Sequence, residues 1–247
     1  MRNKNCGIKI NGKIYPFNYV FKFHQPGYYF IEYSFKSNIT KTDFMFAECY
    51  NLISLDLLSF NFKEVKNMIG MFLECVNIKQ ILLSNLETGN ITNMNSVFSG
   101  CKSLEYLDLK FFNTKNVVNM SRLFFGCESL KNINLSSFNT QNVIDMYAMF
   151  YDCKSLLNLD LLHFYTQNVT NMTKMFYGCN KLKQLDLSNF MTNKVEYMNS
   201  MFFGCYSLII LNIENFNFDK IINMEAMFDS CVSLKRVICR NRNKLHI

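Results

Sequence analysis

The chain has 247 residues, of which 49% are hydrophobic, and it contains only two prolines and nine glycines. Such a chain can bury a sizeable core, and its composition argues against disorder. No stretch approaches the roughly 18 consecutive apolar residues of a membrane span. The start, MRNKNCGIKINGK, is basic but is not followed by the apolar run of a secretory signal. We therefore expect either a protein that stays inside the cell or a fragment of a longer chain.

The net charge of +7 is concentrated at the two ends of the chain. Residues 1–41 carry +6 and residues 235–247 carry +5, whereas residues 42–234 carry −4. A basic protein often binds nucleic acid, but such binding needs the basic side chains to form a patch on the folded body. Because the body here is mildly acidic, we expect no nucleic-acid partner.

Residues 1–41 have the pattern of β-hairpins. The stretch KINGKIY places Asn11-Gly12 between short alternating segments, which is the strongest short hairpin signal. A second hairpin is predicted with Pro26-Gly27 in a type II turn. Its following strand would carry these side chains on one face: Tyr29, Ile31, Tyr33 and Phe35. We expect a small β-rich cap over the first coil of a solenoid; the alternative is the remnant of a larger β-sandwich domain upstream.

The rest of the chain repeats with a fixed period. Cysteine recurs every 26 residues, without insertion or deletion, at positions 49, 75, 101, 127, 153, 179, 205 and 231. A phenylalanine stands three residues before each cysteine, and aliphatic residues follow it at fixed distances, as in Leu104, Leu107 and Leu109. Strict self-similarity at a period of 20 to 50 residues is typical of a solenoid. We expect about eight coils over residues 42–239 and a basic C-terminal tail over residues 240–247.

Within one unit the apolar period changes. Val117, Met120, Phe124 and Cys127 follow a spacing of three to four residues, which predicts a short helix. After the cysteine the pattern changes: in the preceding unit the segment LEYLDL, residues 104–109, has side chains that alternate between two faces, which predicts a strand. A glycine precedes four of the cysteines, where it could cap the helix. Acidic residues or serine take this place in other units (Glu48, Glu74, Asp152 and Ser230), from which we infer that left-handed geometry is not required there.

The consensus MFxGCxSLxxLDLSxFNTxNVxNM contains the phrase L-x-x-L-x-L of leucine-rich repeats. It resembles the BspA-like class over residues 42–239, particularly the 25 to 26-residue version abundant in mycoplasma surface lipoproteins and also seen in protists. The resemblance implies a solenoid of parallel strands and short helices. It also implies a surface or secreted protein with a role in adhesion or host interaction.

The ten cysteines could form disulfides, bind zinc or act in catalysis. Equivalent side chains of stacked coils lie about 4.8 Å apart and run parallel, whereas a disulfide needs converging Cβ atoms. Zinc needs about four convergent ligands, but each coil offers one cysteine and the chain has only three histidines. We therefore predict a ladder of reduced core thiols, with no metal, cofactor or catalytic residue. Reduced thiols also favour a reducing compartment.

Polar residues form further columns in the repeat. One consists of threonines at positions 88, 114, 140, 166 and 192, and another of asparagines at positions 67, 93, 119, 171 and 223. Buried polar groups need hydrogen-bond partners. We expect both columns to satisfy backbone groups in the loops.

The outward face of the strands is the predicted binding site for another protein. Its middle position is mostly acidic or amide, with Asp56, Asp108, Asn134, Asp160, Asp186 and Asn212. The position two residues earlier varies and includes Tyr106, Asn158 and Gln184. Variation on the outside against a uniform inside is what a solenoid recognition surface needs. It is also what any exposed column looks like.

Three functional hypotheses follow. The first is a surface or secreted protein that binds other proteins, which the resemblance implies. The second is an intracellular scaffold, in line with the missing signal and the free thiols. The third is a hydrolase or a cation site, because Asp160 and Asp186 should lie about 5 Å apart and could share a cation. We favour the first two, so the expected protein is a non-enzyme, a monomer and without a membrane span.

Overall fold

A computed structural model describes residues 6–16, 23–25, 27–36, 38–83 and 86–241. The chain divides into two compact units, Met1–Thr40 and Lys41–Ile247, which are described separately. Among the described residues, no helix is long and apolar enough to cross a lipid bilayer.

The first unit is a small antiparallel sheet. Its strands are arranged in the order β2-β1-β3, with bounds β1 Cys6–Ile10, β2 Lys13–Tyr15 and β3 Ile31–Phe35. The Asn11-Gly12 turn joins β1 to β2, and its two residues have φ of 49° and 80°, as a type I′ hairpin requires. The second predicted hairpin falls partly on residues 17–22 and Pro26, which lie outside the described residues. Its following strand, β3, pairs with β1.

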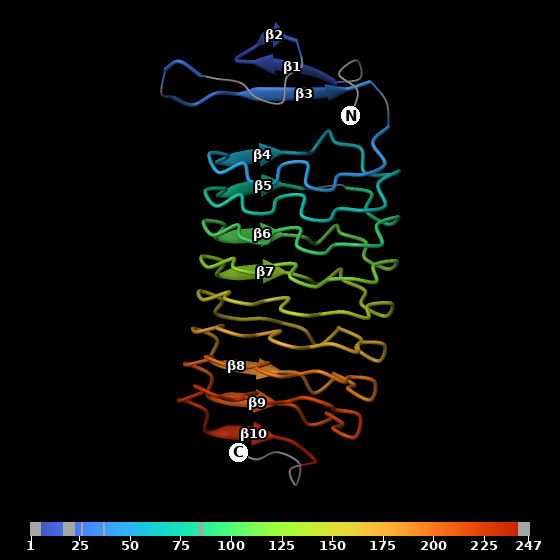
Figure 1. Cartoon of the computed structure of the whole chain (residues 1–247), viewed down its shortest axis with the longest axis vertical. Helices are drawn as coiled ribbons and strands as arrows, with labels where there is room; N and C mark the ends of the chain where they lie inside the picture. Colours follow the sequence, from blue (N-terminus) through green and yellow to red (C-terminus); the bar gives the residue numbers. More distant parts are fainter. Residues whose placement is uncertain (1–5, 17–22, 26, 37, 84–85, 242–247) are drawn as a thin grey trace. The chain divides into compact units, whose positions relative to one another are not determined.

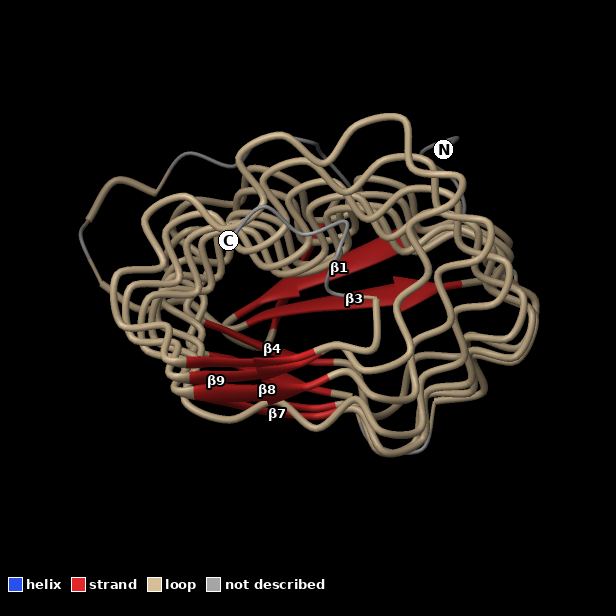
Figure 2. Cartoon of the chain, turned by 90° about the horizontal axis from the view of Figure 1, so that it is seen from below, coloured by secondary structure: helices blue, strands red, loops and turns tan. Residues whose placement is uncertain are grey.

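The second unit is the predicted solenoid. Its short parallel strands share one side of the stack (Figures 1 and 2): β4 Ser54–Asp56, β5 Gln80–Leu82, β6 Tyr106–Asp108, β7 Asn132–Asn134, β8 Gln184–Asp186, β9 Ile210–Asn212 and β10 Arg236–Ile238. Each pairing joins residues one repeat apart, as in Tyr106 with Asn132. The strand side consists of three short sheets, β4-β5, β6-β7 and β8-β9-β10. The coil that contains Asn158 forms no strand, which separates β7 from β8.

A second ladder, which we call the return ladder, holds the coils together on the side away from these strands. It consists of parallel bridges from Lys41 to Asn67 and on, coil by coil, to Asn223. Side chains reinforce the loops nearby, as the polar columns predicted. The Thr114 hydroxyl donates to the Asn139 carbonyl at 2.9 Å and accepts from the Asn139 N–H at 2.8 Å. Buried threonines therefore join successive coils through both of their hydrogen-bonding functions.

The short helices that we predicted before each cysteine are wrong: the described residues contain no helix. The segment is a run of turns, which we call the turn stack, formed by residues 120–126 and their equivalents in the other coils. Alternate N–H groups bond to the next coil, as in Arg122 to Tyr147 at 2.8 Å and Phe124 to Met149 at 2.9 Å. The N–H groups between them bond three residues back, as in Cys127 to Phe124. Bonding between coils replaces the bonding within a helix.

The inference that left-handed geometry is not required before each cysteine is also wrong. Glu48, Glu74, Asp152 and Ser230 all have positive φ, between 53° and 64°, like the glycines at the same place. At Glu48, Glu74 and Asp152 a bond from the N–H to the next coil, such as Glu74 N–H to the Ser99 carbonyl at 2.7 Å, holds the backbone there. Space is also short at two of the glycines, Gly100 and Gly178, where a Cβ would meet the carboxylates of Glu74 and Asp152 one coil earlier.

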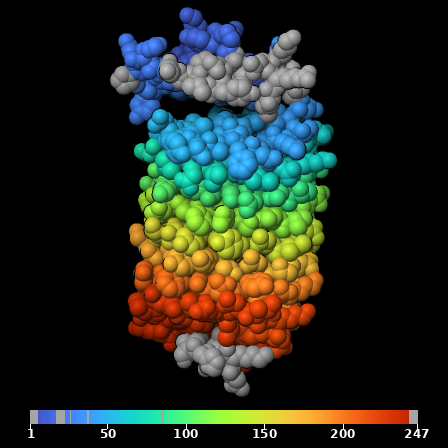
Figure 3. Space-filling view, in the orientation of Figure 1, coloured from blue at the N-terminus to red at the C-terminus, as the bar shows by residue number. Residues whose placement is uncertain are grey.

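The core lies inside the stack and is built from the repeated columns. Seven pairs of phenylalanine rings stack between coils from Phe46 to Phe228, with centroids 5.4 to 5.8 Å apart. The cysteines from Cys75 to Cys205 are fully buried beside them. Figure 3 shows the coils from Lys41 onward as successive bands with no gap between them. Because each coil is covered on both sides by its neighbours, it buries its apolar side chains only as part of the array.

Candidate functional site

The buried thiols have a structural role. In each coil from Cys75 to Cys231, the thiol donates to the carbonyl of the phenylalanine 29 residues earlier, at 2.9 to 3.3 Å. All ten cysteines are free. Burial raises the pKa of the Cys127 thiol to about 12, so this thiol stays protonated and able to donate. The predicted core thiols are confirmed from Cys75 to Cys205, whereas Cys49, in the first coil, is exposed and Cys231, in the last, is half-buried.

The acidic and amide column of the strand face also has a structural role. In each case Oδ1 accepts a hydrogen bond from the N–H two residues later, at 2.8 to 3.1 Å; the residues are Asp56, Asp108, Asn134, Asp160, Asp186 and Asn212. This is an Asx turn, which starts the return loop and, except in the coil of Asp160, ends a strand. Only Oδ1 is needed, which explains why either aspartate or asparagine can stand at these positions.

This arrangement leaves the cation hypothesis without a site in the described part of the chain. No three histidine, cysteine, aspartate or glutamate side chains there are grouped so that they could hold a metal ion. The register places Asp186 beside Asn212 and Asp108 beside Asn134. The coil of Asp160 forms no strand beside that of Asp186. The column is a row of turn caps.

The Asx turn leads to a stability prediction. Replacing Asp108 by alanine removes the acceptor for the Lys110 N–H, 3.1 Å away, and should cost about 1 kcal/mol of unfolding free energy. Asp108→Asn keeps the acceptor and should cost less than half as much. Urea unfolding followed by circular dichroism measures both. Equal losses would show that the charge, and with it the 3.1 Å ion pair to the Lys110 ammonium, matters instead of the cap.

The side chains two residues before these aspartates and asparagines do not cap the turns. Tyr106 is 57% exposed, and Asn158 and Gln184 are also exposed. Tyr106 stands at the start of β6 and Gln184 at the start of β8, and each lies next to an exposed residue of the following coil, Asn132 and Ile210 respectively. These residues form the strand face proper, which is the part of the predicted site that remains available to a partner.

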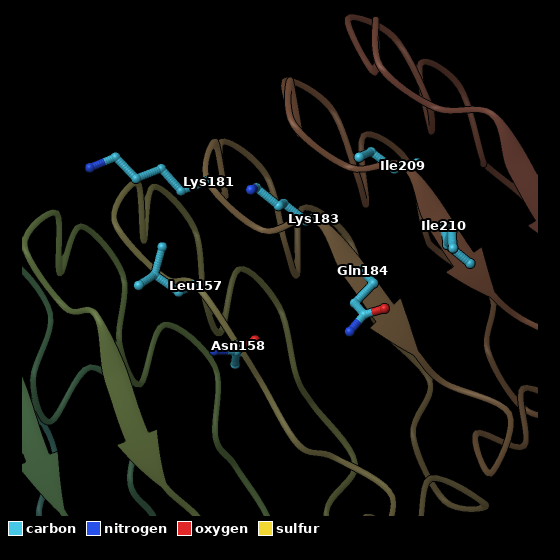
Figure 4. A pocket seen from close by; sticks show the side chains of 7 residues that line it. All are labelled: Leu157, Asn158, Lys181, Lys183, Gln184, Ile209 and Ile210. Carbon is cyan, nitrogen blue, oxygen red and sulfur yellow. The ribbon is translucent and has the colours of Figure 1, made fainter.

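The strand face contains a hollow where the sheet is interrupted. Its volume is about 430 Å³, and three successive coils line it with Leu157, Asn158, Lys181, Lys183, Gln184, Ile209 and Ile210 (Figure 4). Sequence reasoning included Asn158 and Gln184 in the site but missed the other five. A signal was present: four residues after the cysteine, Lys131 and Lys183 alternate with Leu157 and Ile209, which departs from a uniformly polar exposed column.

A row of half-buried aromatic rings on the turn stack was also missed. Phe125, Tyr151, Tyr177 and Phe203 stack face to face, with centroids 4.4 to 4.7 Å apart. Each pair adds about 1 kcal/mol to the contact between coils. Because the rings cover one another's faces, the row stabilises the stack and offers no open aromatic platform.

Stacked 26-residue coils with parallel strands on one side and an internal column of phenylalanine and cysteine define a leucine-rich-type repeat solenoid. Two overlapping stretches, residues 40–161 and 125–241, match the family described as "Mycoplasma protein of unknown function, DUF285". The chain belongs to this family. The match confirms the resemblance to BspA-like repeats that the consensus indicated.

One solved structure is similar over much of the chain. It is a leucine rich cell surface protein from Faecalibacterium prausnitzii A2-165, 14% identical, with a TM-score of 0.33. The match covers 80% of this chain and 62% of that one. A comparison with curated proteins gave no match.

Proposed function

We propose that this protein is a non-catalytic binding protein that contacts another protein through its strand face. The observation that carries the proposal is that only some of the outward side chains have a structural role. The aspartate and asparagine column is committed to Asx turns, whereas Tyr106, Asn158 and Gln184 are exposed and vary in character from coil to coil. A rigid surface whose side chains can change without disturbing the core suits recognition.

The chemistry of the described residues favours binding over catalysis. The repeated thiols from Cys75 to Cys205 are buried, and burial raises their pKa, which removes them as nucleophiles. Acidic side chains are used as turn caps or in exposed ion pairs between coils, such as Glu105 with Lys131 at 2.6 Å. An enzyme usually breaks the regularity of its scaffold to bring several polar groups into one pocket. Such a convergence is not found in the part of the chain that the structure describes.

A location at the cell surface follows from the family resemblance and belongs to the same proposal. The intracellular alternative gained support from free thiols, because exposed thiols become oxidised outside the cell. Burial removes that support for the thiols from Cys75 to Cys205; the Cys127 thiol, for example, is inaccessible, and its raised pKa keeps it protonated. The exposed Cys49 thiol still favours the intracellular alternative. A buried thiol column is compatible with an oxidising compartment. Fractionation of the producing cells with an antibody tests the location.

Site-specific photo-crosslinking tests the binding face. A benzophenone side chain in place of Tyr106 should give a covalent adduct with the partner in the cells that produce the protein. The matched control is the same group in place of Ile144, which is 46% exposed and stands next to Asp145 of the return ladder. We expect adducts at position 106 and not at position 144. Adducts only at position 144, or equally at both, would contradict a binding role for the strand face.

A further inference from the structure

The hollow on the strand face lies where the hydrogen bonding between coils is interrupted. On one side, the Leu157 N–H bonds to the Lys131 carbonyl at 3.2 Å; on the other, the Ile209 N–H bonds to the Lys183 carbonyl at 2.7 Å. Between them, no hydrogen bond joins Leu157 to Lys183 among the described residues. The outer surface is thus hollowed beside β8, and side chains from neighbouring coils surround a common space (Figure 4).

Lys181 and Lys183, at this hollow, lack the acidic neighbours that Lys131 and Lys154 have. Lys131 pairs with Glu105 one coil earlier at 2.6 Å, and Lys154 pairs with Glu128 at 2.8 Å. The residues one coil before and after Lys183 are Leu157 and Ile209, and those beside Lys181 are serines. Neither Lys181 nor Lys183 forms an ion pair within the described residues. Their positive charge is available to a ligand.

Exposed aliphatic side chains lie next to these lysines. Leu157 is 45% exposed, and Ile209 and Ile210 are each 37% exposed. Covering them with an apolar group of a partner removes apolar surface from water, which favours association. Asn158 and Gln184, also in the lining, carry amides that can both donate and accept hydrogen bonds. The hollow therefore combines an apolar surface, two unpaired cations and two side chains suited to a peptide backbone.

We propose that this hollow binds an acidic and aliphatic segment of the partner protein. The inference rests on the proposed function, because it assigns part of the strand face to a partner of stated chemistry. An aliphatic side chain of the segment covers Leu157, Ile209 and Ile210, and a neighbouring carboxylate pairs with Lys181 or Lys183. Asp160 and Asp186 lie two residues further along their coils than Asn158 and Gln184. They repel acidic groups, so the carboxylates of the segment must lie toward the lysines.

The same two aspartates argue against nucleic acid as the occupant. A polyanion needs a continuous basic track, and here the two lysines are bordered by Asp160 and Asp186 on the same strand face. A short segment with one or two carboxylates beside an aliphatic residue can pair with the lysines while its carboxylates stay away from the two aspartates. Charge complementarity thus selects a protein segment.

Synthetic peptides test the proposal with the full chain. The probe is a fluorescently labelled peptide in which leucine alternates with an acidic residue, either glutamate or aspartate. The protein is titrated into the peptide at low salt, and binding is followed by fluorescence anisotropy. Companion peptides replace either its acids by lysine or its leucines by glycine. We expect binding only of the acidic and aliphatic peptide, weakened at least tenfold by Lys181→Glu with Lys183→Glu, and also by Leu157→Ser. The control is Lys63→Glu with Lys115→Glu, which makes the same charge change at exposed residues of the return loops and should leave binding unchanged.

Several results would overturn this inference. One is that the acidic and aliphatic peptide does not bind at millimolar concentration. Another is that the control pair weakens its binding as much as the substitutions in the hollow. The others are that the lysine peptide binds as well as the acidic one, or that a single-stranded oligonucleotide binds more tightly than it. Urea unfolding of each variant shows whether it is folded, so that a loss of binding is assigned to the hollow. If the peptide does not bind but the crosslink at position 106 still forms, the strand face binds a partner and only the proposed role of the hollow is disproved.

Discussion

Cys127→Asp should unfold much of the solenoid. The Cys127 side chain is fully buried and its thiol donates to the Phe98 carbonyl at 3.1 Å. An aspartate there places a carboxylate in the core with no cation near it and turns a donor toward a carbonyl into an acceptor. Leaving a buried charge unpaired costs about 3–5 kcal/mol, a large part of the 5–15 kcal/mol by which typical domains are stable. Thermal unfolding followed by circular dichroism measures the loss.

Cys127→Ala is the matched control for this variant. It removes the thiol without adding charge, so we expect a loss of about 1–3 kcal/mol from a small cavity and one missing hydrogen bond. The loss should spread to the neighbouring coils, since each is covered by the next. If the aspartate and alanine variants melted at the same temperature, position 127 would be open to water and the buried thiol column would be disproved.

A second large effect is expected at alkaline pH. Burial raises the pKa of the Cys75 and Cys127 thiols to about 12 and that of Cys231 to about 11, from an ordinary value of about 9. The unfolded chain loses these protons more readily than the folded chain, so their contribution to stability is complete below about pH 9. It is lost between about pH 9 and about pH 12. Each thiol contributes about 1.4 kcal/mol per pH unit in this range.

Urea unfolding with a reducing agent at pH 7 and at several values up to pH 10.5 measures this dependence. The slope of the unfolding free energy against pH gives the number of protons released on unfolding. Lysines and tyrosines titrate nearby, so the slope is compared with that of Cys127→Ala, which should release about one proton fewer. A slope unchanged by this substitution would contradict the raised pKa of the thiol.

The coils and their core could be predicted because every buried column repeats without interruption. The turn stack could not. Apolar residues three and four apart, such as Met120, Phe124 and Cys127, fit one turn of a helix and a run of tight turns equally well. The difference lies in the positive φ of residues such as Arg122, at 55°. Arginine has no local preference for that geometry; hydrogen bonds to the next coil impose it.

On the strand face, the sequence predicts which side chains point outward but not which of them have a structural role. The sequence places Asp108 and Asp186 on the outside but does not state that each carboxylate is occupied by a backbone N–H. The presence of Asn134 and Asn212 in the same column is the available clue, because asparagine shares only Oδ1 with aspartate. The hollow depends on the missing strand at Asn158, and residues 157–159 have no composition that forbids a strand. The interruption arises from how neighbouring coils fit together.

The one-way hydrogen bonding of the turn stack has an electrostatic consequence. Every N–H that joins two coils there points toward the C-terminal end, so the peptide dipoles of successive coils add along the axis, as they do in a helix. In the last coil the N–H groups of Met224, Ala226, Phe228 and Ser230 meet no acceptor among the described residues. This row forms the positive end of the peptide dipoles of the turn stack, and the exposed Lys235 and Arg236 belong to the same coil. The turn stack is thus electrically polar, with the positive end of its dipoles at the last described coil of the solenoid.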